Sequence, residues 1–97
     1  MASQPVIYIL SNKKNGTLYV GVTTNLIQRI WQHKNKISVG FSSKYELDKL
    51  VYYELHEDIK NAILREKQIK KWRREWKLNL INQQNPHWVD LWDQVLG

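Results

Sequence analysis

Three short apolar runs give this chain its first structural signal. Residues 6–10 and 17–21 are rich in β-branched and aromatic side chains, and the polar segment between them ends in Asn15 and Gly16. Two such runs around an Asn-Gly pair predict a β-hairpin. A third run, residues 49–55, has the same strand-forming composition and predicts a third strand.

The remaining apolar residues recur at helical spacing. This spacing predicts helices over 24–35, 59–75, 76–84 and, near the C-terminus, through Trp88, Leu91, Trp92 and Val95. A loop is expected over 35–43, and Pro86 disfavours helix at the residue before it. The order of two strands, a helix, a strand and three helices predicts an α+β fold with a small, three-stranded, mainly antiparallel sheet flanked by helices. A chain of 97 residues is expected to form one domain, over residues 1–97.

Composition narrows the class of protein without naming a function. The chain is 42% hydrophobic and 25% charged, which is ordinary for a folded domain and argues against disorder. No run reaches the roughly 18 apolar residues that a membrane span needs. The chain has no cysteine, which excludes disulfides and thiolate zinc sites and fits a cytoplasmic location.

The positive charge is concentrated in one segment. The formal net charge is +6, and residues 60–77 hold eight Lys and Arg against two Glu, so this segment carries the whole excess. A concentrated basic stripe indicates a polyanionic partner, although a solvated helix face is the simpler alternative. Trp72 and Trp76 lie in the same region and could stack on a base or cover the sheet. The candidate nucleic-acid-binding residues are Lys67, Lys70, Lys71, Arg73, Arg74 and Lys77.

Glu66 interrupts an apolar stripe. The stripe consists of Ile59, Ala62, Ile63 and Ile69 at helical spacing, and Glu66 falls in its middle. A carboxylate that faces a core costs several kcal/mol unless it is paired or binds a cation. Either Lys70, four residues further on, pairs with Glu66, or the carboxylate binds a metal ion held mainly by water and substrate phosphate.

Four further residues could carry chemistry. In a hairpin Tyr8 and Tyr19 can lie near each other, although both could be ordinary strand aromatics. Arg29 and His33 are four residues apart on one helix flank, suited respectively to phosphate binding and to proton transfer. Alone, such a pair is more often an ordinary surface Arg and helix-edge His. Two phenols, a guanidinium, an imidazole and the carboxylate of Glu66 together would make a site that cuts phosphodiesters.

With these positions the chain resembles the GIY-YIG nuclease family. The two tripeptide motifs correspond to 7–9 and 19–21, and Val6 replaces the glycine of the first motif. Some members have a lysine where this chain has Val22. The resemblance covers about residues 5–92 and is closer to small stand-alone bacterial proteins similar to the N-terminal nuclease domain of the excinuclease of DNA repair.

The resemblance implies a DNA endonuclease with one divalent ion, Mg²⁺ or Mn²⁺. By this resemblance Tyr19 would deprotonate or orient the attacking water and Tyr8 would align it, or the reverse. Arg29 would stabilise charge on the phosphorane, His33 would help to position the water or a phenol, and Glu66 would hold the metal ion. The family also has a late catalytic asparagine, for which Asn85 is the candidate and Asn79 and Asn82 are alternatives.

The expected partner is DNA that is branched, nicked or damaged, because a domain this small has little surface for reading bases. A partner protein could supply further specificity. The alternative function is a nucleic-acid-binding module with little or no catalysis. A protein-interaction module that exposes Trp88 and Trp92 as one apolar patch is a third hypothesis.

Overall fold

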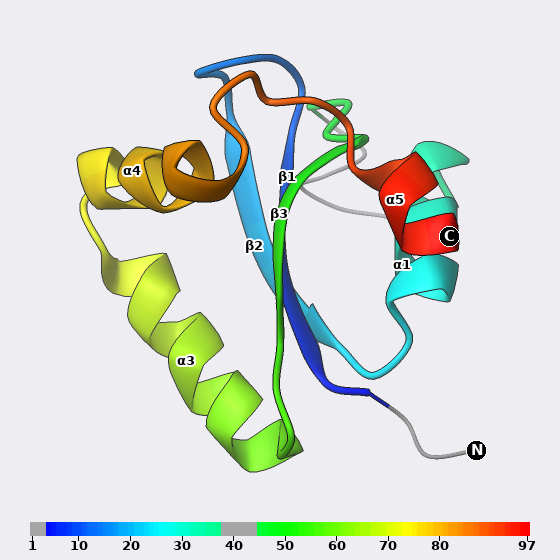
Figure 1. The fold of residues 1–97 in the computed structure, drawn as a ribbon, viewed down its shortest axis with the longest axis vertical. Coiled ribbons are helices and arrows are strands. Elements are labelled where there is room, and N and C mark those ends of the chain that lie inside the picture. The colour runs from blue at the N-terminus through cyan, green and yellow to red at the C-terminus, as the bar shows by residue number, and fades with distance from the viewer. Residues whose placement is uncertain (1–3, 38–44) are drawn as a thin grey trace.

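The computed structural model describes residues 4–37 and 45–97, so most of the loop expected over 35–43 lies outside the described residues. A three-stranded sheet has the strand order β2-β1-β3, and both pairs are antiparallel. Helices cover the sheet, which confirms the predicted α+β class (Figure 1). The elements are β1 (Val6–Ser11), β2 (Leu18–Thr23), α1 (Leu26–Lys34), β3 (Lys49–Leu55), α3 (Ile59–Lys71), α4 (Arg74–Gln84) and α5 (Trp92–Leu96).

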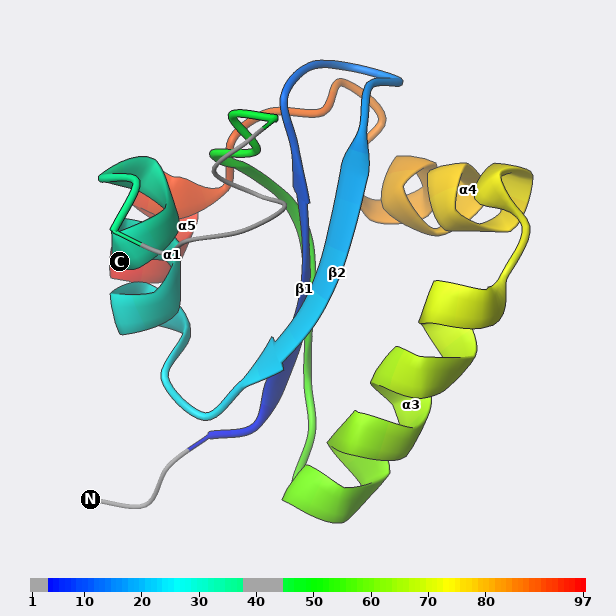
Figure 2. The same cartoon turned by 180° about the vertical axis from the view of Figure 1, so that it is seen from behind.

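The central strand β1 separates two apolar cores. Side chains alternate between the faces of a strand. Ile7 and Ile9 therefore enter one core, beneath α3 and α4, and Tyr8 and Leu10 enter the other, beneath α1 and α5. Both views of the ribbon show α3 and α4 on one side of the sheet and α1 and α5 on the other (Figures 1 and 2). Every residue of β1 is buried, which makes it the best-protected element of the sheet.

The predicted hairpin is present. Asn15 adopts a left-handed backbone conformation with φ of 58°, and the amide of Gly16 donates to the carbonyl of Lys13 over 2.9 Å. The second strand was expected over 17–21 but runs to Thr23, because Thr23 pairs with Val6 at the far end of the ladder.

The long basic helix is shorter than predicted. Helix α3 ends at Lys71 instead of residue 75, and α4 begins at Arg74. Trp72 and Arg73 between them are extended, with ψ of 152° and 150°. Trp72 packs against the core beneath α3 and α4, and the bend lets Ile81 of α4 enter the same core. Packing of these two side chains breaks the helix here, without a glycine or proline to signal it.

The C-terminal helix also differs from its prediction. Trp88 does not belong to it: the residue has a positive φ of 53° and is 5% exposed. Its indole Nε1 donates to Asn82 Oδ1 over 2.7 Å. Trp88 lies in the core beneath α3 and α4, whereas Trp92 packs against the core on the opposite face of the sheet. The hypothesis that both form one exposed patch is therefore wrong.

A cluster of polar side chains fastens α3 to β3. Arg65 of α3 donates from Nε to Glu54 Oε1 over 2.9 Å, and His56 Nε2 lies 2.9 Å from the same oxygen. The hydroxyl of Tyr52 donates to Glu54 Oε2. Burial raises the pKa of Glu54, but the hydrogen bonds from Arg65, Tyr52 and His56 outweigh it and hold the pKa below its ordinary value. The carboxylate is thus the central acceptor of this cluster.

Replacing Glu54 by glutamine is expected to lower the free energy of unfolding at neutral pH by about 1–3 kcal/mol, because it leaves the Arg65 charge without its anion. The lowered pKa means that the carboxylate stabilises the fold above its unfolded pKa and loses this effect as the pH falls through its folded pKa. The difference between variant and wild type should therefore shrink below the ordinary glutamate pKa of about 4.3. Urea unfolding at a series of pH values measures it. Exposed Glu57→Gln is the control, and a difference that stays constant with pH would contradict the role.

Candidate active site

The hairpin brings Tyr8 and Tyr19 together on one face of the sheet. Tyr8 pairs across the strands with Gly21, and Tyr19 lies two residues before Gly21 on the same face. The two ring centroids are 6.2 Å apart. Tyr8 is 2% exposed, whereas Tyr19 is only half-buried. One phenol is thus enclosed and the other reaches the rim.

Gly21 makes this arrangement possible. A Cβ atom at this position would lie 2.5 Å from both Cζ and Oη of Tyr8, closer than side chains tolerate. The Tyr8 ring is enclosed on its other sides and has little room to move away. Gly21 belongs to the second tripeptide motif, but the sequence did not reveal that its role is to admit the ring of Tyr8.

We expect Gly21→Ala to destabilise the fold by about 1–3 kcal/mol, the usual cost of overpacking. The Tyr8 phenol must shift, so any activity that depends on it should fall as well. Urea unfolding measures the first effect. Gly97→Ala is a control, because nothing lies within 4 Å of the added atom there. A Gly21→Ala variant as stable as wild type would show that the ring is freer than its burial indicates.

Helix α1 carries His33 to the two tyrosines. Asn25 caps the helix by accepting from the amide of Gln28, and Ile30 anchors it in the core beneath α1 and α5. His33, three residues after Ile30, is buried, and its Nε2 lies 3.3 Å from the Tyr8 hydroxyl. The His33 ring centroid is 5.9 Å from that of Tyr8 and 5.6 Å from that of Tyr19. The three rings therefore form one compact cluster.

Arg29 is exposed on α1, one turn before His33, and its charge reaches the cluster. Burial raises the pKa of Tyr8 well above its ordinary value, the neighbouring Tyr19 adds to this, and Arg29 opposes it. Burial also lowers the pKa of His33, and Arg29 lowers it further. Near neutral pH, Tyr8 therefore keeps its proton and His33 is uncharged, so the Tyr8 hydroxyl can donate to Nε2 of His33.

Glu66 approaches the cluster from the other side of the sheet. Helix α3 packs against β2 and β1, and the negative charge of Glu66 contributes to the raised pKa of Tyr8. The Glu66 side chain is 13% exposed and lies 3.4 Å from Lys70 Nζ. Glu66 is thus shielded as predicted, and the predicted pair with Lys70 is present too.

The apolar stripe around Glu66 is only partly buried. Ala62 and Ile69 have no exposed surface, whereas Ile59 and Ile63 are each 38% exposed. Glu66 therefore lies at the border of the core, next to its buried residues. That position leaves the carboxylate access to a ligand arriving from the solvent side.

Glu66 can bind a divalent ion only if water and substrate supply most of the other ligands. The described residues contain no group of three or more His, Cys, Asp or Glu side chains that could hold a metal ion. A site here would thus depend on a single carboxylate oxygen ligand from the protein. Mg²⁺ suits this, since it keeps several waters and is often held by one carboxylate plus substrate phosphates.

Asn85 is buried away from the ring cluster. Its Nδ2 donates to the carbonyls of Val51 and Val89 over 3.0 and 2.8 Å, and its Oδ1 accepts from the amide of Val89 over 3.0 Å. These bonds tie the end of α4 to β3. Of the alternatives, Asn82 accepts from Trp88, and Asn79 is exposed on α4. The structure brings none of the three to Tyr8, and a catalytic role for Asn85 stays a prediction.

The predicted basic residues divide into two groups. Arg74 donates from Nη2 to the carbonyls of Asn15 and Gly16 over 2.7 and 2.6 Å, which fastens α4 to the hairpin turn. Lys77 donates to the carbonyl of Lys70 over 3.2 Å, and burial lowers its pKa, as does the charge of Arg74. The others have exposed side chains: Lys67, Lys70, Lys71 and Arg73.

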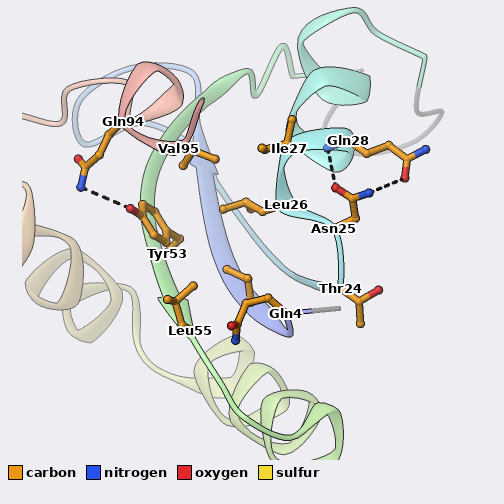
Figure 3. Close-up of a pocket in the computed structure, with 11 residues that line it drawn as sticks. Gln4, Thr24, Asn25, Leu26, Ile27, Gln28, Tyr53, Leu55, Gln94 and Val95 are labelled. Atoms are coloured by element: carbon orange, nitrogen blue, oxygen red, sulfur yellow. Dashed lines mark hydrogen bonds between the residues drawn. The ribbon is translucent and has the colours of Figure 1, made fainter. Parts of the chain in front are cut away.

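A cavity of about 730 Å³ opens away from this chemistry. It lies between the start of α1, the end of β3 and α5, where Leu26, Tyr53 and Val95 are among its lining residues (Figure 3). Its lining includes neither of the clustered tyrosines, and it includes none of Arg29, His33 and Glu66. In the ring cluster Tyr8 and His33 are buried, and the half-buried Tyr19 is the ring that reaches the solvent.

The fold and the order of these residues define a nuclease class of domain. The sequence profile of the GIY-YIG catalytic domain matches residues 4–79, so the chain belongs to the GIY-YIG family. GIY-YIG domains are nuclease domains that generally act on DNA with a divalent metal ion.

Three bacterial relatives match most of the chain. A UPF0213 protein of Clostridium perfringens is 41% identical over 76 residues, which are 78% of this chain and 81% of the relative. A UPF0213 protein of Syntrophus aciditrophicus is 36% identical over 85 residues, 87% of this chain and 95% of the relative. A UPF0213 protein of Staphylococcus saprophyticus is 34% identical over 77 residues, which are 79% of this chain and 93% of the relative. No solved structure matches significantly.

Proposed function

We propose that this protein is an endonuclease that hydrolyses DNA phosphodiester bonds with one divalent ion, Mg²⁺ or Mn²⁺. The observation that carries the proposal is the convergence of Tyr8, Tyr19 and His33, with Arg29 one helix turn before His33 and with Glu66 on α3, which packs against β2. We further propose that it selects the structure of the DNA instead of its sequence and acts in the cytoplasm.

Tyr19 is the phenol better suited to act on the attacking water. Tyr8 holds its proton firmly because burial raises its pKa, and its hydroxyl faces His33. Tyr8 thus serves as a hydrogen-bond donor that aligns the cluster. Tyr19 is half-buried, lies beside Tyr8, and can contact both solvent and substrate. This supports Tyr19 as the residue that orients the water and that, in its phenolate form, would accept the proton of the water.

Arg29 is suited to the phosphate. Its guanidinium is exposed and can bind two phosphate oxygens at once. As negative charge builds up on the phosphorane, an arginine already in place stabilises it without reorganisation. His33 is uncharged and holds the Tyr8 hydroxyl in position, so it supports the alignment of the phenols and does not compete with Arg29 for the phosphate.

Glu66 would hold the metal ion, and the bound ion would polarise the phosphate and stabilise the leaving oxygen. Lys70 now neutralises the Glu66 carboxylate. Because Lys70 is exposed and flexible, it can turn to a phosphate when Glu66 takes another partner. The pair thus gives the carboxylate a partner in the free protein.

DNA would contact the outer surface of α3 and the start of α4. The exposed Lys67, Lys70, Lys71 and Arg73 can reach phosphates. Such contacts are independent of base sequence, so affinity should fall steeply with salt concentration. Arg74 and Lys77 instead keep α4 in place, and their effect on binding would be indirect. Branched, nicked or damaged DNA is the substrate class that we propose, with a partner protein as a further source of specificity.

Purified protein incubated with nicked, branched and intact duplex DNA tests the proposal. Cleavage should require Mg²⁺ or Mn²⁺ and stop with a chelator. Salt-sensitive binding without cleavage of any substrate would instead favour the alternative function, a nucleic-acid-binding module without catalysis.

A further inference from the structure

A second cavity, of about 270 Å³, opens where α3 meets α4. Its size lies just below the roughly 300–1,000 Å³ of sites for drug-sized ligands, so it suits a smaller group. Its lining combines aromatic, apolar and amide side chains: Trp72, Trp76, Asn79, Leu80 and Gln83. None of the residues of the candidate active site lines it.

Two tryptophans form a corner in this cavity. The rings of Trp72 and Trp76 are 6.1 Å apart between centroids and lie at 77° to each other. Trp72 is partly buried and packs against the core, whereas Trp76 is 50% exposed. A flat aromatic group stacked on the Trp76 ring would turn its edge towards Trp72, and both contacts are favourable aromatic geometries.

The rest of the lining can read the edge of such a group. Asn79 and Gln83 are four residues apart on α4, so both lie on the helix face that bears Trp76. Each amide offers a donor and an acceptor. Both residues are exposed, and Leu80 supplies an apolar contact between them. A ligand with a flat ring and a polar edge matches this lining.

Two guanidinium groups pack on the rings of the corner, and each also pairs with a carboxylate: Arg65 with Glu54 over 2.9 Å and Arg73 with Glu75 over 3.6 Å. The guanidinium carbon of Arg65 lies 5.0 Å from the Trp72 ring centroid, and that of Arg73 lies 5.9 Å from the Trp76 ring centroid. Exposed Lys71 ends α3 beside them. The exposed Lys71 and Arg73 can still meet a phosphate, so a ligand that carries a phosphate beside its flat ring, which is a nucleotide, fits this lining.

We propose that the corner between Trp72 and Trp76 binds one unpaired base of single-stranded DNA. This deepens the proposed function, on which it rests, because it names the part of the DNA that would be selected. A duplex keeps its bases stacked on each other and cannot offer one to the corner without unpairing. An unpaired strand would reach the corner by passing Lys71 and Arg73 at the bend.

Binding of a fluorescent oligothymidylate without divalent metal tests this, because no cleavage can then occur. Trp76→Ala is expected to weaken binding about 5- to 150-fold, which corresponds to about 1–3 kcal/mol for one base stacked on an aromatic ring. Affinity for an intact duplex of equal length should stay within about twofold, since only phosphate contacts hold it. Trp76→Phe should retain part of the affinity.

Trp31→Ala is the matched control, because Trp31 is 49% exposed on α1 and lines no part of the cavity. It should bind the oligonucleotide as wild type does. Unchanged binding by Trp76→Ala, or equal losses for oligonucleotide and duplex, would overturn the inference. If the wild-type protein cleaves DNA, the proposed function survives either of these results. If the wild-type protein does not cleave DNA but Trp76→Ala weakens oligonucleotide binding, the corner is a base-binding site although the proposed function fails.

Discussion

Glu66→Gln is expected to lower the rate of DNA cleavage more than about 100-fold, because it removes the single carboxylate that would hold the divalent ion. The fold should persist, since Glu66 and Lys70 form an ion pair between residues i and i+4 of one helix, and such a pair stabilises a helix by only about 0.2–0.5 kcal/mol. Single-turnover cleavage at a fixed Mn²⁺ concentration, together with Mn²⁺ binding followed by calorimetry, measures both consequences.

Glu75→Gln is the matched control for this substitution. Glu75 is an exposed acid at the start of α4, and the change removes the same charge from the basic region. It should leave Mn²⁺ binding unaltered and cleavage within about twofold, since its pair with the exposed Arg73 is weak. If Glu66→Gln cleaved at the wild-type rate, the metal ion would have to be held elsewhere and the proposed mechanism would fail.

The second large effect concerns the tyrosines. Tyr19→Phe is expected to reduce the cleavage rate about 10²–10⁴-fold, the usual loss when a general base is removed. Tyr8→Phe should cost less, because the Tyr8 phenol keeps its proton and only donates to His33. Cleavage rates at saturating DNA, compared between the two variants, give the order.

The reverse order of these effects would exchange the roles of Tyr8 and Tyr19. DNA binding without metal serves as the control, and neither substitution should change it, since neither residue belongs to the exposed basic surface. A loss of binding together with the loss of cleavage would show that the phenols act on substrate affinity instead of on the reaction.

Local patterns predicted the parts of the fold that are determined locally. The Asn15-Gly16 pair and the strand-forming runs around it were enough for the hairpin, and with it for the proximity of Tyr8 and Tyr19. The third strand was predicted at its observed bounds, Lys49–Leu55, because a run of strand-forming residues is enclosed by polar ones.

Features that depend on long-range packing were not predictable in the same way. A boundary between two helices was predicted at 75/76, but the observed break lies at Trp72 and Arg73, because Trp72 and Ile81 enter one core and no breaking residue marks the position. The left-handed backbone of Trp88 has no signal in its residue type. The bond of Glu54 to Arg65 joins a strand to a helix, and neither residue's own pattern points to the other.

The candidate site shows the same division. The order of Tyr8, Tyr19, Arg29 and His33 in the chain could be read directly, and their proximity follows from one hairpin and one helix. Nothing in that order showed that burial would keep Tyr8 protonated. That property depends on the core beneath α1 and α5, to which Leu47 and Leu50 contribute from a distant part of the chain.

The site spans the two cores, and this determines the order in which its residues come together as the chain is synthesised. The phenols, the guanidinium and the imidazole all lie within the first 33 residues, whereas Glu66 arrives with α3, which must dock on the other core. A nascent chain that has emerged only as far as α1 holds the groups that touch phosphate but lacks the carboxylate. The proposed hydrolysis therefore requires both layers to have closed on the sheet.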